Sequence, residues 1–490
     1  MNFPILSAIV LTPLVAGLIL LCLPADRHSW VRGIALVAAT LVLGLALVLY
    51  LRYDTHLGGY QFIERYPWLP DLGISYAVGV DGFSLPMVLL GALVLFSGVL
   101  VSWNVEERPR EFFAFMMFLA TSILGVFVSL DLFLLFFFFE IAVFPKYLMI
   151  VLWGYPKTRD YGGMKLTLYL FIGSVLALVG ALALYFNSGL RTFDLLALEK
   201  ANFGVDFQRF WFPFIFLGFA VLGGIFPFHS WAPDGHVAAP TAISMLLAGV
   251  EMKVGAFAAL RTGIMLLPQG AQFWSPLILA LATINVVYGA AIAMVQTDFK
   301  YVIGFSSVSH MGLVLIGFAT LSREGLLGAG LQMFSHGVMT ALFFAIVGMV
   351  YDRAHTRDIP ALGGLARVMP WAAVGFIISG LVSMGMPGFS GFIAEFPVFL
   401  GAWQRAPWVA VIAVLGIIIT SAYILLVVRR VFFGEMPAAL ADKVGDVSGK
   451  DKGVILLLSA IMILLGWFPS LLTPFVESGV RHILALVGGA

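Results

Sequence analysis

Apolar stretches about twenty residues long recur along nearly the whole chain, and they restrict the fold more than any other feature. A helix of about 20 apolar residues is long enough to cross the hydrocarbon layer of a membrane. Fourteen such windows lie at 3–23, 31–51, 83–103, 111–129, 131–153, 164–187, 211–227, 239–262, 273–297, 302–320, 326–350, 370–402, 408–430 and 454–474. The chain is only 11% charged, whereas soluble domains are about 25% charged. The sequence therefore predicts an all-α polytopic membrane protein with about fourteen transmembrane helices.

The composition argues against several classes of function. A net charge of +1 and the lack of any run of five basic residues disfavour a nucleic-acid surface. The single cysteine, Cys22, cannot by itself build a disulfide, an iron–sulfur cluster or a cysteine zinc site. The sequence also lacks a Walker loop, a Rossmann glycine fingerprint and a nucleophile elbow. We expect neither a cofactor nor a metal in this chain, and infer that it moves charge.

Two predicted spans are interrupted by proline and glycine, one in each half of the central region. The interruptions are PFHSWAPDGH at 227–236 and MGMPGFSGF at 384–392. Such broken helices often indicate inverted repeats with a binding site near the middle of the membrane. The alternative is a pair of ordinary proline kinks.

The positive residues predict an orientation. Sixteen Lys and Arg lie in the odd-numbered loops and eight in the even-numbered loops. The positive-inside rule then places the odd loops in the cytoplasm and both termini outside. The loop 54–82 would be an outer cap, and the last stretch, VESGVRHILALVGG, an interfacial tail.

Two ionisable residues lie deep inside predicted spans. Glu140 is near the middle of the fifth span, and Lys253 is in the eighth, about 21 Å from its start at 1.5 Å per residue. A charge at this depth costs at least about 2.5–3.5 kcal/mol, so such residues usually face a water-filled interior. We interpret both as functional. Glu251 is about 200° around the helix from Lys253 and cannot pair with it on one face; it is either functional or a contact to a neighbouring helix.

Two histidines and a further glutamate complete the set of buried candidates. His310 and His336 fall in consecutive spans, and Glu395 follows the second interruption. A lone histidine on an apolar face usually belongs to the core, but two beside buried acids favour a proton relay, since histidine titrates near neutral pH. A histidine metal site is disfavoured, because the carboxylates are too scattered to complete a ligand set.

Three residues near the membrane borders have two interpretations each. His229 and His236 flank the first interruption, where they either shape the loop or form a proton entrance from the cytoplasm. Lys300 is either part of the same entrance or a solvated loop charge.

The motifs around these residues resemble those of the antiporter-like membrane subunits of respiratory complex I, a superfamily that includes Mrp-type antiporters and membrane-bound hydrogenases. They appear in family order over roughly 130–400 as FFFFEIAVFP, PFHSWAPDGHVAAPTAISMLLAG, MKVGAF, QTDFKYVIGFSSVSHMGLVLIG, QMFSHGVMTALFF, RAHTRDIPALGGL and GMPGFSGFIAEF.

The resemblance implies two inverted five-helix repeats, each with one broken helix. It divides the chain into helices 1–3 with an outer loop (1–110), helices 4–8 (111–262), helices 9–13 (273–430), and a cytoplasmic loop with helix 14 and an outer tail (431–490). Glu140 looks like the family's fifth-helix glutamate, Lys253 like the central lysine, His310 and His336 like the bridging histidines, and Glu395 like the terminal glutamate.

The resemblance also implies partners and a location. The chain would lie in a bacterial inner membrane, among lipids, beside antiporter-like subunits of types L and N. NADH, FMN, iron–sulfur clusters and quinone would be bound by other subunits, with protons as the transported species and no nucleic acid involved.

One residue of the family pattern is missing. The family carries a lysine, the partner of the fifth-helix glutamate, where this chain has Leu222. Lys146 stands where relatives usually carry an uncharged residue, about 22 Å deep against about 16 Å for Leu222. We predict that Lys146 supplies the missing charge, with Pro145 loosening the helix beside it. The alternative is that Lys146 snorkels to the cytoplasmic interface.

These observations predict a proton-translocating subunit of NADH:quinone oxidoreductase, acting through a central series of Glu, Lys and His and driven by redox chemistry elsewhere. The alternatives are a subunit of an Mrp-type cation/proton antiporter or of a membrane-bound hydrogenase, and a structural subunit whose channel is inactive.

Overall fold

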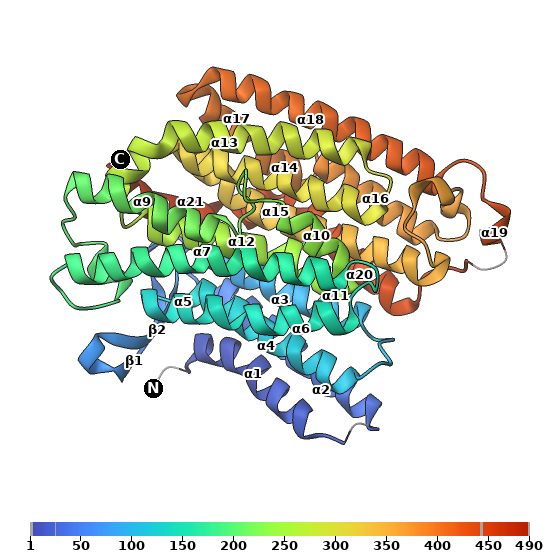
Figure 1. The fold of residues 1–490 in the computed structure, drawn as a ribbon, viewed down its shortest axis with the longest axis horizontal. Helices are drawn as coiled ribbons and strands as arrows, with labels where there is room; N and C mark the ends of the chain where they lie inside the picture. Colours follow the sequence, from blue (N-terminus) through green and yellow to red (C-terminus); the bar gives the residue numbers. More distant parts are fainter. Residues whose placement is uncertain (1–2, 25, 442–443, 489–490) are drawn as a thin grey trace.

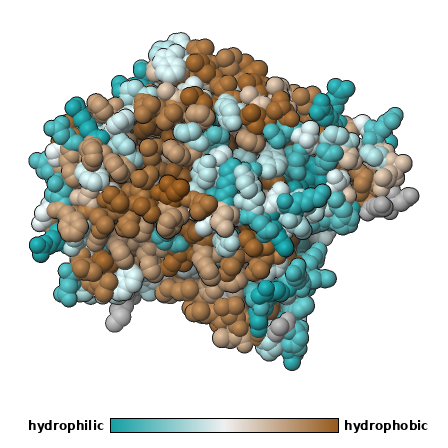
Figure 2. Space-filling model, viewed as in Figure 1, coloured by the Kyte–Doolittle hydropathy of each residue, from teal (hydrophilic) through white to brown (hydrophobic). Residues whose placement is uncertain are grey.

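The computed structural model describes residues 3–24, 26–441 and 444–488. Lys443, one of the sixteen loop cations, lies outside these ranges. Figure 1 shows long helices packed side by side, with α1 and α2 along one edge of the bundle and α18 along the opposite edge. Figure 2 shows a hydrophobic middle region with hydrophilic residues gathered toward the two helix ends. The view agrees with a bundle whose sides face lipid.

Eleven helical segments among the described residues are long and apolar enough to cross a membrane. They are α1 (Ile5–Cys22), α2 (His28–Arg52), α3 (Ser84–Val101), α4 (Pro109–Val128), α5 with α6 (Leu132–Ile141, Val143–Trp153), α7 (Arg159–Asn187), the segment Thr241–Ile264, α13 (Pro268–Val295), α14 (Phe299–Thr320), α15 (Arg323–Ala354) and α18 (Pro407–Val427), which continues as the π-helical turn η6 (Val428–Phe432).

The other three predicted windows also contain helices. The first holds α9 (Val205–Ala220), which is followed by α10 (Trp231–Ala238), and the second holds α16 (Pro370–Ser383) and α17 (Ser390–Arg405). The third holds α20 (Gly449–Trp467), whose start carries three charged residues. The all-α membrane fold is thus confirmed, whereas the count of fourteen crossings and the repeat relationship remain predictions.

Both proline and glycine interruptions break their helices. Between α9 and α10 the side chain of Asn285 donates to the carbonyl of Gly224 at 2.7 Å, and Trp231 Nε1 donates to the carbonyl of Val221 at 2.8 Å. These bonds satisfy backbone groups that the broken helix leaves without partners. α9 ends before the predicted limit at 227, because Gly223 and Gly224 follow it and Gly224 has a φ of +79°. The second break, between α16 and α17, contains Gly385 and Gly388, also with positive φ.

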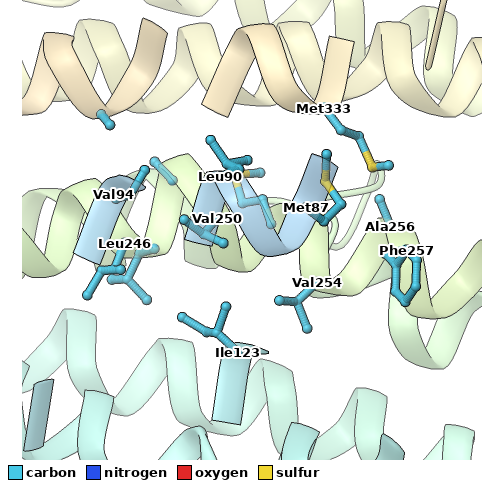
Figure 3. Packing of buried hydrophobic residues seen from close by; sticks show 14 of the residues in the cluster. Met87, Leu90, Val94, Ile123, Leu246, Val250, Val254, Ala256, Phe257 and Met333 are labelled. Atoms are coloured by element: carbon cyan, nitrogen blue, oxygen red, sulfur yellow. The ribbon is translucent and has the colours of Figure 1, made fainter. Parts of the chain in front are cut away.

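The segment Thr241–Ile264 lies at the centre of the bundle. It consists of α11 (Thr241–Leu246), the π-helical turn η2 (Leu247–Glu251), α12 (Met252–Ala258) and a second π-helical turn η3 (Ala259–Ile264). In Figure 3 its residues Leu246, Val250 and Val254 pack against side chains of α3 and α4. Protein rather than lipid therefore surrounds this segment, which is fully buried in its most apolar window.

Two features at the predicted outer end were not foreseen. The loop 54–82 contains an antiparallel hairpin of β1 (Gln61–Leu69) and β2 (Ile74–Val80). The predicted interfacial tail forms the helix α21 (Thr473–Val487), which packs against α3 and α15. The contact is close, because a Cβ on Gly82 would lie 1.9 Å from the carbonyl oxygen of Phe475.

Candidate functional site

Lys253 is fully buried inside the protein, as the sequence predicts. Its ammonium donates to the carbonyl of Ala248, which belongs to the π-helical turn η2. A π turn shifts backbone hydrogen bonds to residues five apart, and such turns often occur at functional sites. No carboxylate lies within 4 Å of this ammonium among the described residues. The Lys253 ammonium is therefore held by a backbone oxygen rather than by a counter-ion.

Lys146 and Glu251 form an ion pair that the sequence did not predict. Lys146 Nζ lies 2.8 Å from Glu251 Oε2, and both side chains are only 1% exposed. The snorkelling interpretation of Lys146 is therefore wrong. Glu251 faces a neighbouring helix, and the contact it makes there is a buried charge pair between α6 and η2.

Glu140 lies on α5, which continues through Ala142, a residue with helical dihedral angles, into α6 and Lys146. Its carboxyl is partly buried, and its Oε1 has no hydrogen-bond partner among the described residues. Lys146, the one lysine in this predicted span, is bonded to Glu251 instead. Leu222 is buried and apolar, so no cation occupies that position.

A second cluster lies on α14, α15 and α17. His310 Nδ1 and Gln332 Nε2 each lie 3.2 Å from Glu395 Oε1. His310 Nε2 contacts the hydroxyl of Ser383 at 2.9 Å. All four side chains are buried, so the second break, next to Ser383, brings a hydroxyl and a carboxyl to one histidine.

His336 and His236 lie on the inner sides of α15 and α10. The ring of His336 stacks on that of His310, with centroids 5.3 Å apart. Both nitrogens of His336 and both of His236 are buried without a hydrogen-bond partner in the described part of the chain. Buried polar atoms are normally satisfied, and ordered water is the usual partner where protein supplies none. Both helices pack against η2, the turn that holds the Lys253 ammonium, so the two histidines lie on helices that border the central segment.

Lys300 is not the solvated loop charge that one interpretation described. It is 5% exposed, and its ammonium donates to the carbonyl of Ala239 at 2.5 Å. It lines a cavity of about 590 Å³ at the end of the bundle predicted to face the cytoplasm, together with Asp352 and Arg357. Ala239 is the C-cap of α10, the helix that carries His236. Lys300 thus connects the polar cavity with the end of that helix.

His229 lies apart from that cavity. Its ring stacks on Phe226 and meets the edge of Tyr288, and it is not among the residues that line the 590 Å³ cavity. Both interpretations of His229 remain predictions.

Sequence reasoning missed Gln332 and the pairing of Lys146 with Glu251. Gln332 lies four residues before His336 on α15, a spacing that places both on one helix face, and this signal could have found it. The ion pair joins residues 105 positions apart, and no local pattern indicates such a contact. Among residues 3–24, 26–441 and 444–488, no group of three or more His, Cys, Asp or Glu is arranged to hold a metal ion.

The family described as "NADH:quinone oxidoreductase/Mrp antiporter, TM" matches residues 129–420. The chain belongs to this family. It is 36% identical to NAD(P)H-quinone oxidoreductase chain 4 2 of Thermosynechococcus vestitus, over 100% of this chain and 93% of the relative. It is also 36% identical to NADH-quinone oxidoreductase subunit M of Rhodobacter capsulatus, over 98% of this chain and 96% of the relative.

Two solved structures show the same fold. A chain of respiratory complex I from Thermus thermophilus superposes with a TM-score of 0.89 at 32% identity, covering 98% of this chain and 99% of that one. A chain of the Mrp complex from Dietzia superposes with a TM-score of 0.88 at 18% identity, covering 100% of this chain and 99% of that one, which shows the fold alone. Both belong to multi-subunit complexes, and the predicted family and multi-pass membrane nature of the chain are confirmed.

Proposed function

We propose that this chain is the M-type, proton-translocating subunit of a bacterial NADH:quinone oxidoreductase. The observation that supports this most is Lys253, a fully buried lysine held by a backbone carbonyl. The protein interior also holds two clusters of ionisable side chains, the pair Lys146–Glu251 and the cluster of His310 and Glu395. We call these residues, with Glu140 and His336, the central row.

The central row can carry protons because each of its members has a side chain that binds and releases one. A lysine held in apolar surroundings can carry or release its proton with small changes around it. Histidine passes protons readily at neutral pH, and the unsatisfied nitrogens of His336 offer two such positions. Gln332 and His310 orient the Glu395 carboxyl, so a proton reaching it arrives at one defined oxygen.

The redox chemistry belongs to other subunits in this proposal. NADH, FMN, iron–sulfur clusters and quinone would be bound there, and electron transfer would change the electrostatic field at the central row. Because a charge next to a buried carboxyl changes its proton affinity, such a field change would force proton uptake or release. Neighbouring subunits of types L and N would lie on either side of this chain.

We also infer the orientation. The cavity beside Lys300 and Arg357 would face the cytoplasm, as would the other positive loops. Both termini, the hairpin β1–β2 and helix α21 would then lie on the outer side of the inner membrane.

The test is Lys253→Ala in the whole complex, reconstituted into liposomes and supplied with NADH and quinone. We expect protons moved per NADH oxidised to fall by the share that this chain carries. Lys200→Ala, at an exposed loop lysine, is the matched control and should move protons normally. Unchanged proton movement in Lys253→Ala would instead identify an inert structural subunit. Transport that depends on Na⁺ would favour the antiporter alternative.

A further inference from the structure

The helix α18 presents an exposed apolar stripe along one edge of the bundle. The side chains of the stripe recur every three or four residues, a spacing that places them on one face of a helix. They are Val411, Leu415, Ile418, Ala422 and Leu425, and all five are exposed. Figure 1 shows α18 at the edge of the bundle, and Figure 2 shows hydrophobic surface along much of that edge. The stripe therefore faces away from the rest of the described chain.

The two ends of α18 place this stripe across the membrane. Trp408 lies at the start of the helix and is 52% exposed, and the exposed Arg429 continues the stripe at its end. The two residues are separated by about 31 Å at 1.5 Å per residue, and the hydrocarbon layer of a membrane is about 30 Å thick. Tryptophan is enriched at the membrane–water interface. A span that begins at Trp408 therefore brings Arg429 to the opposite interface, which we infer to face the cytoplasm.

A basic cavity lies at that end of the stripe. Its volume is about 340 Å³, and its charged lining consists of Arg429 and Arg430 from η6 and of Glu435. Within the described ranges neither arginine forms an ion pair, and the salt bridges on either side of them in the sequence join other residues. The short helix η5 (Leu365–Arg367) contacts η6 and brings a third arginine to the same end of the bundle. The cavity thus has a net positive charge directly beside apolar surface.

Two backbone segments define the shape of this cavity. The N–H of Gly364 donates to the carbonyl of Phe433 at 3.4 Å. Gly364 and Gly434 both have positive φ, +64° and +92°, a conformation that glycine adopts without steric cost. The loop before α16 and the end of η6 are therefore packed backbone against backbone, which fixes the position of the arginines relative to the loop.

We propose that this cavity binds the phosphate of an anionic phospholipid, whose acyl chains lie along the inner half of the α18 stripe. Arginine donates two parallel hydrogen bonds to a phosphate, and basic pockets at the cytoplasmic ends of membrane helices bind anionic headgroups. A soluble phosphate would use the arginines but not the stripe, whereas a helix of a neighbouring subunit would use the stripe but not the arginines. A phospholipid uses both. This inference goes beyond the proposed function and does not depend on it.

Photocrosslinking in the whole complex tests this site. The complex is reconstituted into phosphatidylcholine vesicles that contain a trace of photoreactive lipid, either phosphatidylglycerol or phosphatidylcholine with the same reactive group in one acyl chain. Mass spectrometry then identifies the labelled peptides. We expect phosphatidylglycerol to label residues 418–425 more strongly than phosphatidylcholine does. Residues 411–415 should be labelled equally by both lipids, because they lie in the other leaflet.

Substitutions at the arginines should remove this preference. A basic residue near an anionic lipid contributes about 1 kcal/mol, which corresponds to about fivefold in binding. Arg429→Gln and Arg430→Gln should each lower the preference about fivefold, and the double variant should label equally with both lipids. Replacing both arginines by lysine keeps the charge but loses the paired hydrogen bonds, so it should give an intermediate preference and separates lost binding from lost folding. Glu435→Gln removes the acid of the cavity and should raise the preference.

The matched control removes two charges elsewhere on the same predicted side. Arg27 and Lys157 are exposed loop residues that do not line this cavity. Arg27→Gln with Lys157→Gln should therefore leave the preference unchanged. The Lys253→Ala complex should also be labelled normally, so failure of the proposed function and failure of this inference are distinguishable.

Four outcomes would overturn the inference. Equal labelling of 418–425 by the two lipids in the unmodified complex, or an unchanged preference in the double Gln variant, would show that the arginines do not select a headgroup. Lack of labelling of this segment by either lipid would show that a neighbouring subunit covers the stripe. Loss of the preference on adding millimolar glycerol phosphate would identify a site for a soluble phosphate instead.

Discussion

Gly385→Ala tests how closely the second helix break controls Glu395. Gly385 has a φ of +64°, and a Cβ added there would lie 2.7 Å from Glu395 Oε2. Carbon–oxygen contacts this short do not persist, so the carboxyl would have to move. Glu395 is 3% exposed and shares its Oε1 with His310 and Gln332 at 3.2 Å.

The expected cost has two parts. An L-residue in the left-handed region costs roughly 1–2 kcal/mol. Displacing the carboxyl weakens hydrogen bonds to a buried charged group, which are worth about 1.5–3 kcal/mol each. The sum for one weakened bond is roughly 2.5–5 kcal/mol.

Gly388→Ala is the matched control. Gly388 lies in the same break with a φ of +93°, but its added Cβ would meet only Trp467 Nε1, at 3.8 Å, which is an ordinary contact. Both variants should lower the apparent melting temperature of the purified complex, whereas only Gly385→Ala should also slow proton transfer per assembled complex in liposomes. Equal transfer in the two variants would show that Glu395 does not depend on this contact.

Three further predictions concern other parts of the chain. Asp81→Ala should destabilise the protein by about 3–5 kcal/mol, because it leaves the buried Arg261 without its carboxylate partner. The two hydrogen bonds between these side chains are 2.8 and 2.9 Å long. Thermal unfolding should show that adding Arg261→Met recovers most of the lost stability. Asn285→Ala should lower the free energy of unfolding by about 1–3 kcal/mol, since it leaves a backbone carbonyl of the first break without a partner. Thermal unfolding of the variant, measured together with its proton transfer, checks this. The hydrogen bond from Lys452 holds the pKa of Asp446 below its ordinary value. The contact therefore stabilises the fold fully when the pH is above the ordinary pKa, and this stabilisation is lost as the pH falls through the lowered pKa. Lys452→Met should accordingly raise the pH at which an acid-active protease begins to cut near Asp446.

The membrane fold and the buried position of most site residues could be predicted from the sequence. Long apolar windows determine where helices cross, and a charge such as Lys253 inside one indicates a protected interior because lipid would not accept it. Proline and glycine marked both helix breaks for the same local reason, since they remove hydrogen bonds or permit positive φ.

The contacts between residues far apart in the sequence could not be predicted in the same way. The pairing of Lys146 with Glu251 depends on how α6 packs against the central segment. Hydropathy does not indicate which faces of two distant helices contact each other. The π spacing of η2 was equally hidden, because α and π turns use the same residue types. The hairpin β1–β2 was missed because it lies between apolar windows and its first strand is mostly exposed.

Helix α21 has a consequence for how the chain is made. It follows the other helices of the described residues, yet it packs against α3 and α15 at the predicted outer end, where Gly82 and Gly479 permit backbone contact with almost no room to spare. Translation therefore has to reach residues 473–487 before helices inserted much earlier gain this neighbour. Until then that end lacks α21, and a stop codon before Thr473 would leave it so.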